Sequence, residues 1–458
     1  MLAFTDSTRF GRRCFLRAGS LALGGAAFGP SVFGGAPLSA GKPGTDKSVI
    51  FLFLHGGPSQ FETFDPKMTA PAEVRSVTGE VATALPGVTF GGSFPKLAAL
   101  ADRVTVVRSF TTGDANHDIK PVVGKDTFGA NLGSAFASAA GGTDPTTGLP
   151  TNVLLFPRAV APDAQAGTMS FGKFAATGPF GAAATPFQPD GDGELRRDMK
   201  LGIPLDRLGD RRTLLSAFDA AQAGLESESL DANRKTAFAM LLGGAADAFD
   251  LAKEDPKLVA KYDTAPLVKV DAIDKKWKNH KNYADNAQSL GKLLLLARRL
   301  CERGAGFVTV TTNFVWDMHA DVNNATVKEG MSYMAPPLDH ALCAFLEDVK
   351  ARGLDEKILL VACGEMGRTP KINKNGGRDH WGNLAPLLLA GGGLKTGQVI
   401  GRSSSNGGEP NSEPVRMTNL IGTVMHTLFD VGRLRVTRGV SREVLQLSEY
   451  APIPGLHE

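Results

Sequence analysis

The sequence is poor in cysteine and tyrosine, and it has no long apolar run. Only 4 of its 458 residues are cysteine and none forms a C-x-x-C pair, which predicts that no disulfide framework holds the fold. The lack of any stretch of 18 uninterrupted apolar residues excludes a multi-pass membrane protein. With 42% apolar and 21% charged residues, the composition is that of a globular protein and excludes a chain disordered throughout.

A surplus of positive charge is also lacking once the first residues are set aside. The formal net charge is +3, and residues 1–17 alone carry +3 through their four arginines and Asp6. The remaining residues therefore balance to zero. A chain without a basic surplus lacks the electrostatic footprint of a nucleic-acid-binding protein, so we expect no nucleic-acid partner.

The N-terminus has the pattern of a twin-arginine export signal. Arg12 and Arg13 precede a large apolar pair, a mild apolar stretch rich in Gly and Ala follows, and small residues at 34–40 offer a cleavage zone. We therefore predict that residues 1–40 are an export signal that engages the twin-arginine translocase. The expected location is the periplasm or the extracellular space. Because this route carries folded proteins, the signal favours a protein that acquires a metal or cofactor before export.

Apolar runs typical of buried strands alternate with helical patterns along the rest of the chain. The predicted strands are 48–54, 103–107, 152–156, 307–311, 358–362 and 386–390. The predicted helices are 94–101, 211–224, 230–252, 282–303, 337–352 and 417–429. This order predicts a single α/β domain over 41–458, with a mainly parallel sheet between helices and a helical insertion at about 194–305.

Polar residues cluster in five loops, most of them directly after a predicted strand. These loops are 55–65, 109–118, 315–321, 364–369 and 377–382. Ligands of open parallel sheets bind beyond the carboxyl ends of the strands, so these loops are the places to look for chemistry. Their carboxylates and imidazoles suit a divalent cation such as Zn²⁺ or Mn²⁺, and Arg368 and Arg378 are candidates to hold an oxyanion. A single loop histidine is more often a surface hydrogen-bonding residue, so the evidence for a functional site comes from the five clusters taken together.

Several of these motifs resemble a known family. The sequence resembles the sulfatase-like family called domain of unknown function 1501. The resemblance rests on the twin-arginine leader and on the motifs HGGPSQFETFDPK (55–67), WDMH (316–319), GEMGRTPKIN (364–373) and GRDHW (377–381). The resemblance covers about residues 48–432. That family is placed in the alkaline phosphatase superfamily, whose members are mostly metal-dependent hydrolases of phosphate or sulfate esters. The resemblance thus implies an alkaline phosphatase-like or sulfatase-like fold and one or two divalent ions, Zn, Mn or Ca.

The resemblance also implies a set of site residues. An acidic ligand after the first strand matches Glu62 or Asp65, an Asp and a His after a later strand match Asp317 and His319, and a further acid and a distant His match Glu365 and His380. The candidate metal ligands are Asp317, His319, Glu365, His380, Asp379, Glu62 and Asp65, and the candidate catalytic residues are Thr111, Thr112 and Arg368.

One departure concerns the nucleophile. A sulfatase has a Cys or Ser in a C/S-x-P-S-R pattern after the second strand, whereas this chain has Thr111, Thr112 and Gly113 there. Thr111, Thr112 or Ser59 remain as possible nucleophiles, and no cysteine is present to become a formylglycine.

Three functions follow from these observations. The first is an exported, metal-dependent hydrolase acting on an anionic phosphate or sulfate ester, including one on a glycan. The second is a non-catalytic exported relative that binds an envelope or polysaccharide ligand. The third is a metal-dependent isomerase or mutase of the same superfamily.

Overall fold

The computed structural model describes residues 43–189 and 245–457. The predicted export signal, the predicted helix at 211–224 and most of that at 230–252 lie outside these residues.

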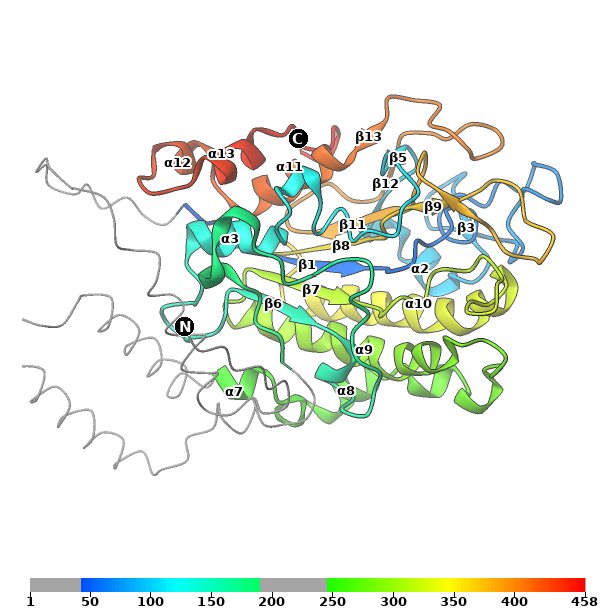
Figure 1. The fold of residues 1–458 in the computed structure, drawn as a ribbon, viewed down its shortest axis with the longest axis horizontal. Coiled ribbons are helices and arrows are strands. Elements are labelled where there is room, and N and C mark those ends of the chain that lie inside the picture. Colours follow the sequence, from blue (N-terminus) through cyan, green and yellow to red (C-terminus); the bar gives the residue numbers. More distant parts are fainter. Residues whose placement is uncertain (1–42, 190–244, 458) are drawn as a thin grey trace, which may run out of the picture.

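A central sheet organises the described part of the chain (Figure 1). Its strands lie in the order β12-β4-β11-β8-β1-β7-β6. Their bounds are β1 Ser48–Phe53, β4 Thr105–Val107, β6 Asn152–Leu155, β7 Phe307–Thr311, β8 Ile358–Cys363, β11 Leu387–Gly391 and β12 Gln398–Ile400. All pairings are parallel except those of β11, which runs antiparallel to both β4 and β8. The sheet is therefore mainly parallel, as the sequence predicts.

Helices cover both faces of this sheet because its strands are apolar on both sides. Along β1, Ile50 and Leu52 point into one core, while Phe51 and Phe53 point into the other. The first core includes α9 His280–Glu302 and α10 Val327–Ala351, which lie below the sheet in Figure 1. The second includes α3 Leu132–Ala140, α11 Met417–Leu428 and α13 Arg442–Glu449. The predicted α/β class, a sheet between helices, is confirmed.

The remaining elements are short. Within residues 43–189 and 245–457, the other α-helices are α2 Pro95–Ala99, α7 Ala245–Ala248, α8 Pro256–Tyr262 and α12 Val431–Val436. The same residues form three two-stranded ribbons, which pair β2 Glu80–Ala82 with β3 Thr89–Gly91, β5 Phe110–Thr111 with β13 Val415–Arg416, and β9 Gly367–Arg368 with β10 His380–Trp381.

One predicted boundary was wrong. The helix expected to begin at Pro337 begins at Val327, so that Pro336 and Pro337 lie inside α10. Its start is fixed by Thr326, whose hydroxyl accepts a hydrogen bond from the backbone N–H of Glu329 at 3.1 Å and donates one to the Glu329 carboxylate at 2.8 Å. This is an N-terminal cap that outweighs the helix-breaking tendency of the two prolines.

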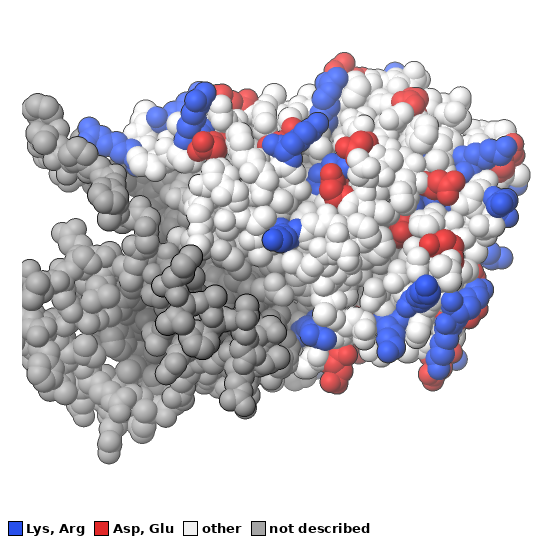
Figure 2. Space-filling view, in the orientation of Figure 1, with Lys and Arg blue, Asp and Glu red and all other residues white. Residues whose placement is uncertain are grey.

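Charges and cysteines complete the description. Figure 2 shows Lys and Arg side chains interspersed with Asp and Glu on the described part of one face. Cys301, Cys343 and Cys363 are buried free thiols. None of the described helices is both long and apolar enough to cross a membrane.

Candidate metal centre

Loops from distant parts of the chain converge beyond the carboxyl ends of the central strands. The loop after β1 contains His55 and Gly56, the loop after β7 contains Asp317, and the loop after β8 contains Glu365. His117, in the loop after β5, and His380, in β10, complete the group. Of the side chains predicted from sequence to meet at this edge, Asp317, Glu365 and His380 therefore lie in one neighbourhood, as expected for a parallel sheet.

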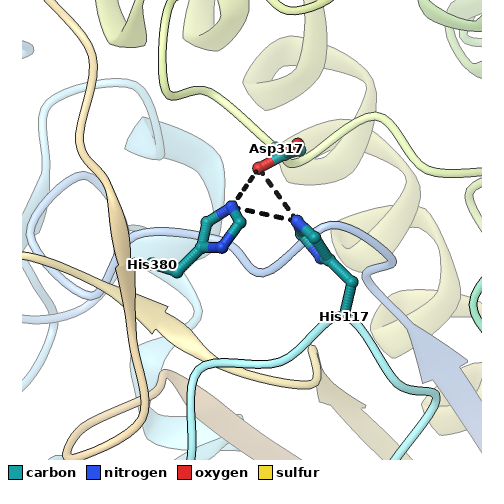
Figure 3. A group of neighbouring side chains, drawn as sticks. All are labelled: His117, Asp317 and His380. Carbon is teal, nitrogen blue, oxygen red and sulfur yellow. Dashed lines mark hydrogen bonds and ion pairs between the residues drawn. The ribbon is translucent and has the colours of Figure 1, made fainter.

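Three side chains each point one atom at a common space (Figure 3). His117 Nε2 lies 3.0 Å from His380 Nε2 and 3.4 Å from Asp317 Oδ1, and His380 Nε2 lies 3.1 Å from the same oxygen. Ligand atoms about 2.0–2.1 Å from a tetrahedral ion are separated from one another by about 3.3 Å. The spacing of these three atoms therefore fits a single divalent cation, and the donor set leaves one position open.

An outer carboxylate fixes the orientation of His117. Glu365 is fully buried, and its Oε1 lies 2.9 Å from His117 Nδ1. The same carboxylate accepts the backbone N–H of Gly56 with both oxygens, at 3.0 and 3.1 Å. Because Glu365 accepts a hydrogen bond from the Nδ1–H of His117, the lone pair of this imidazole is left on Nε2, the atom that faces His380 and Asp317. A carboxylate behind an imidazole ligand is the usual outer partner of a metal-bound histidine.

The charges around Asp317 keep it ionised. Burial alone would raise its pKa, but Arg368, whose Nη2 lies 2.8 Å from Oδ1, and hydrogen bonds from His117, His319 and His380 hold the pKa of Asp317 well below its usual range.

His117 responds to the same carboxylates. Burial lowers its pKa, but Asp317 and Glu365 outweigh burial and raise the pKa of His117 to about 8. The surroundings of this imidazole thus favour a positive charge, whether it comes from a bound proton or from a metal ion.

The second oxygen of Asp317 is occupied differently. His319 Nε2 lies 3.0 Å from Oδ2, and Asn324 Nδ2 donates to Oδ2 at 3.0 Å. The Asn324 amide is oriented by Asn279, whose Nδ2 donates to Asn324 Oδ1 at 2.7 Å. An N–H donor thus lies where a second cation would need an acceptor, so this side of Asp317 favours a single ion.

Glycine allows the loops to approach each other this closely. Gly56 has φ +111, and a Cβ added to it would lie 2.5 Å from the backbone nitrogen of Asp317. Arg368 fastens the same contact by donating to the carbonyl oxygens of Gly56 and Gly57. Any larger residue at position 56 would push the loops after β1 and β7 apart.

The backbone after β7 is strained next to the centre. Asn313 and Phe314 are consecutive non-glycine residues with φ of 57 and 63. The ring of Phe314 lies 4.9 Å from that of His117 and stacks on Phe171 at 4.5 Å. Asn313 Oδ1 accepts the backbone N–H of Thr168 at 2.6 Å, which fastens the loop carrying Thr168 and Phe171.

A cavity of about 340 Å³ opens from this group of side chains. Its described lining comprises His117, Thr168, Phe171, Asn279, Asn282, Phe314, Asp317, His319, Asp321, Asn323, Asn324 and His380. A small organic molecule thus has access to the space between His117, Asp317 and His380.

Two predicted metal ligands are engaged elsewhere. Glu62 is fully buried and forms a two-pronged ion pair with Arg378, whose Nε and Nη2 each lie 3.2 Å from a carboxylate oxygen. Ser59, a possible nucleophile, donates its hydroxyl to the same carboxylate. Asp65 accepts a hydrogen bond from Ser403 and lies 3.3 Å from Lys67 Nζ.

The other predicted residues also differ in their placement. Asp379 is exposed and accepts a hydrogen bond from Asn373 at 2.9 Å. Thr111 pairs with Arg416 between β5 and β13, and the Thr112 hydroxyl lies 3.4 Å from two carbonyl oxygens. Arg368 is buried, and its guanidinium donates hydrogen bonds to carbonyl oxygens and to Asp317. It therefore holds the loops together and is not free to contact a substrate.

Sequence reasoning missed His117. It lies in the second polar loop, in the run Asp114-Ala115-Asn116-His117-Asp118, which has the same mixture of carboxylates and imidazole as the loop containing Asp317. That mixture was the available signal. The structure places its imidazole between Glu365 and His380.

His55 is a buried histidine without a polar partner among the described residues. Both ring nitrogens of His55 lack a hydrogen bond to any described residue, and its ring packs among Phe53, Phe174 and Phe314. Burial lowers the pKa of His55 to about 4, so the ring is neutral at pH 7.

Comparisons with known proteins were made by sequence and by structure. A search of curated protein sequences found no significant match. Among solved structures, Ps i-CgsB in complex with k-i-k-neocarrahexaose aligns at 11% identity over 83% of this chain and 71% of that chain, with a TM-score of 0.35. The phosphonate monoester hydrolase of Silicibacter pomeroyi aligns at 12% identity over 83% of this chain and 73% of that chain, with a TM-score of 0.28.

A third structure is the alkaline phosphatase from the Antarctic bacterium TAB5, which aligns at 12% identity over 80% of this chain and 96% of that chain, with a TM-score of 0.22. By sequence, one family model matches residues 46–439, nearly the whole described chain. The chain therefore belongs to the family described as protein of unknown function (DUF1501).

Proposed function

We propose that this protein is an exported, metal-dependent hydrolase of phosphate or sulfate esters. The observation that carries the proposal is the triangle of His117 Nε2, Asp317 Oδ1 and His380 Nε2, whose sides of 3.0, 3.1 and 3.4 Å match the spacing of ligand atoms around one ion. Three protein ligands with an open position beside a cavity are typical of catalytic metal sites rather than structural ones.

The donor set supports Zn²⁺ or Mn²⁺ over Ca²⁺. Two of the three atoms are imidazole nitrogens, whereas Ca²⁺ takes six to eight oxygen ligands. When bound, such an ion would supply Lewis-acid activation of water and of the ester oxygens. Because the hydroxyls of Thr111 and Thr112 do not line the cavity, we propose water as the nucleophile in place of either threonine.

His319 is suited to proton transfer. It lines the cavity, and its Nε2 is oriented by the second oxygen of Asp317 at 3.0 Å. In the hydrolysis, the oxygen of water forms a bond to phosphorus or sulfur and releases one proton to the solvent, while the bond from phosphorus or sulfur to the alcohol oxygen breaks. The leaving alcohol oxygen then takes a proton, for which His319 is the proposed donor.

Metal content and hydrolysis of the purified full chain test the proposal. We expect the wild type to bind about one Zn²⁺ or Mn²⁺ per chain and to hydrolyse at least one ester from a panel containing p-nitrophenyl phosphate, bis(p-nitrophenyl) phosphate and p-nitrophenyl sulfate. His117→Ala removes one of three ligands and should lose the ion and reduce kcat/KM by about 100-fold or more.

The exposed His457 provides a matched control, because His457→Ala removes an imidazole that lines no part of the cavity. That variant should keep both metal and activity. A wild-type chain that binds neither Zn²⁺ nor Mn²⁺ would overturn the proposal. A chain that binds the ion but hydrolyses none of the esters would favour a non-catalytic binding protein.

A further inference from the structure

Uncharged polar side chains form part of the lining of the cavity beside the candidate centre, and together they are called its wall here. Thr168, Asn279, Asn282 and Asn323 form this wall. Among the described residues, the side chains of Asn282 and Thr168 have no hydrogen-bond partner, and both residues are half-buried. These two groups each offer a donor and an acceptor to whatever enters the cavity.

The other two amides in the wall present acceptors. Asn279 donates from its nitrogen to Asn324, and Asn323 donates from its nitrogen to Asp321 Oδ2 at 2.9 Å. Their side-chain oxygens accept no hydrogen bond from a described residue. A ligand that only accepts hydrogen bonds, such as a carboxylate, leaves these two oxygens unpaired. A hydroxyl both donates and accepts, so it pairs with every group of the wall.

The charged residues that line the cavity also disfavour a negatively charged ligand group. No Lys or Arg of the described residues lines it, whereas Asp321 contributes a carboxylate beside Asn323. Arg368 is buried against Asp317 and the carbonyl oxygens of Gly56 and Gly57. A negative group placed beyond the proposed ion would therefore meet the Asp321 carboxylate and no Lys or Arg of the described residues.

Aromatic rings add an apolar surface to the same cavity. Phe171 and Phe314 stack at 4.5 Å with an interplanar angle of 23°, and both line the cavity. Phe171 is half-buried, so part of its ring remains open. The C–H face of a sugar ring or polyol chain can lie against such a surface while its hydroxyls reach the amides.

We infer that the alcohol part of the ester is an uncharged, hydroxyl-rich group, a sugar or a polyol, and that the cavity disfavours an alcohol part carrying a further negative charge. This inference rests on the proposed function, because it assigns the part of the substrate that lies beyond the ester bond.

Two compounds that differ in one group make the test. Glucitol and gluconate share a chain of hydroxyls, and gluconate carries a carboxylate in place of one hydroxymethyl group. Saturation-transfer NMR on the metal-loaded wild type, with excess inorganic phosphate present to occupy the open position of the ion, should detect glucitol binding and about tenfold weaker gluconate binding. If an ester of the panel is a substrate, the kcat/KM of glucitol 6-phosphate or 6-sulfate should exceed that of the matching gluconate ester by about the same factor.

Variants of Asn282 make the assignment specific. Asn282→Leu should weaken glucitol binding by about fivefold to tenfold, and it should lower the kcat/KM of glucitol 6-phosphate or 6-sulfate more than that of the matching p-nitrophenyl ester, because the p-nitrophenyl esters have no sugar hydroxyls. Asn282→Lys adds the missing cation and should reverse the preference toward gluconate. Gln288→Leu on the exposed side of α9 removes an amide outside the cavity and serves as the control.

The outcomes separate this inference from the proposed function. Equal or tighter binding of gluconate by a metal-loaded wild type overturns the inference, and it leaves the hydrolase standing if the chromogenic esters are cleaved. An unchanged preference in a folded Asn282→Lys variant also overturns it. Loss of metal binding and hydrolysis, with glucitol still bound in preference to gluconate, overturns the hydrolase and retains the cavity's selectivity for uncharged hydroxyl-rich molecules.

Discussion

Glu365 lies out of contact with solvent, and its carboxylate connects two parts of the candidate centre. One oxygen accepts a hydrogen bond from the Nδ1–H of His117, and both accept one from the backbone N–H of Gly56. A buried carboxylate held in this way orients the imidazole and raises its basicity. We therefore regard Glu365 as a positioning residue and not as a direct ligand.

Replacing Glu365 with glutamine tests this role. Glu365→Gln keeps the size of the side chain but removes its negative charge. With the amide oxygen in the place of Oε1, His117 keeps its acceptor and Gly56 loses one of its two acceptors, so the change mainly lowers the basicity of the imidazole. We expect the affinity for Zn²⁺, measured by calorimetric titration, to fall by about 10–100-fold while one ion still binds at saturation. Complete loss of the ion in a folded variant would instead identify Glu365 as a ligand.

The matched control for this substitution is Glu356→Gln. It makes the same chemical change at an exposed position outside the cavity. Its Zn²⁺ affinity should equal that of the wild type.

At the scale of single residues, the sequence identified the right kinds of side chain but not all of the right positions. Asp317 was predictable because it follows a predicted strand in a loop with acids and an imidazole, and His380 was predictable because the family resemblance implies a distant histidine after Glu365. Glu62 has the same local signature, yet Arg378, more than 300 residues away in sequence, turns it into an ion-pair partner. Only the folded chain reveals such a long-range partner.

The loop that carries His117 is held by one buried lysine. Lys120 Nζ lies 2.6 Å from Asp114 Oδ1 and 2.9 Å from Asp118 Oδ1, on either side of His117. Its side chain is 4% exposed, whereas the two carboxylates are about half exposed. The lysine thus draws both ends of the loop toward the protein and fixes the position of His117.

Removing that charge should loosen the loop. For Lys120→Met, which keeps the length of the side chain, we expect about tenfold weaker Zn²⁺ binding because His117 must be ordered by the ion itself. Lys125→Met, at an exposed position in the same region, should bind Zn²⁺ like the wild type. Equal affinities in the two variants would show that the loop is rigid without Lys120.

An ion-pair network joins α9 and α10 on one face of the sheet. Glu254 Oε2 lies 2.7 Å from Arg298 and 2.8 Å from Arg299, and its Oε1 lies 3.2 Å from Arg352. Burial raises the pKa of Glu254, but hydrogen bonds from Arg299 and Arg298 outweigh burial and lower the pKa to about 2. This carboxylate therefore stabilises the fold most when it is ionised.

The pH dependence follows from the direction of that shift. Since the folded-state pKa lies below the ordinary value of 4.5, the stabilisation by Glu254 is fully present above pH 4.5 and is lost as pH falls toward 2. Urea unfolding of Glu254→Gln should give a lower free energy of unfolding at pH 7 and a shallower decline between pH 4.5 and 2. Glu413→Gln, at an 86% exposed side chain, should follow the wild-type profile.

At the scale of elements, apolar runs predicted β1, β7 and β8 within a residue or two. The start of α10 was predicted wrongly because Pro336 and Pro337 were taken to mark the beginning of the helix. Thr326 and Glu329 have the spacing of a capping box, which indicates the observed start. The reversed direction of β11 was beyond prediction, because a short apolar run has the same pattern in either orientation.

For the whole molecule, the sequence predicted an α/β fold with a site at the carboxyl edge of its sheet. That much follows from the alternation of elements and from polar loops after strands. The order of the strands could not be predicted, because β1 lies between β8 and β7, which begin about 300 and 250 residues after β1 ends.

Export remains a prediction at this scale. Changing Arg12 and Arg13 together to lysine removes the arginine pair while keeping its charge, and we expect the full-length precursor to remain in the cytoplasm. Cell fractionation checks this, with Arg9→Lys as the control outside the pair. Normal export of the double variant would show that the N-terminus is not a twin-arginine signal.

The positions of the three proposed ligands have a consequence for how the chain comes apart. An ion shared by residues 117, 317 and 380 acts as a removable cross-link that closes loops of about 200 and 60 residues, which makes it part of the thermodynamics of folding. At a free concentration 100 times its Kd, such an ion adds about 2.7 kcal/mol to the free energy of unfolding. The melting temperature should therefore rise with added Zn²⁺ and fall with a chelator, whereas His117→Ala should melt at one temperature in both. In a cell starved of the metal, the protein would consequently be easier to unfold, and the amount of folded protein would fall with the supply of the ion.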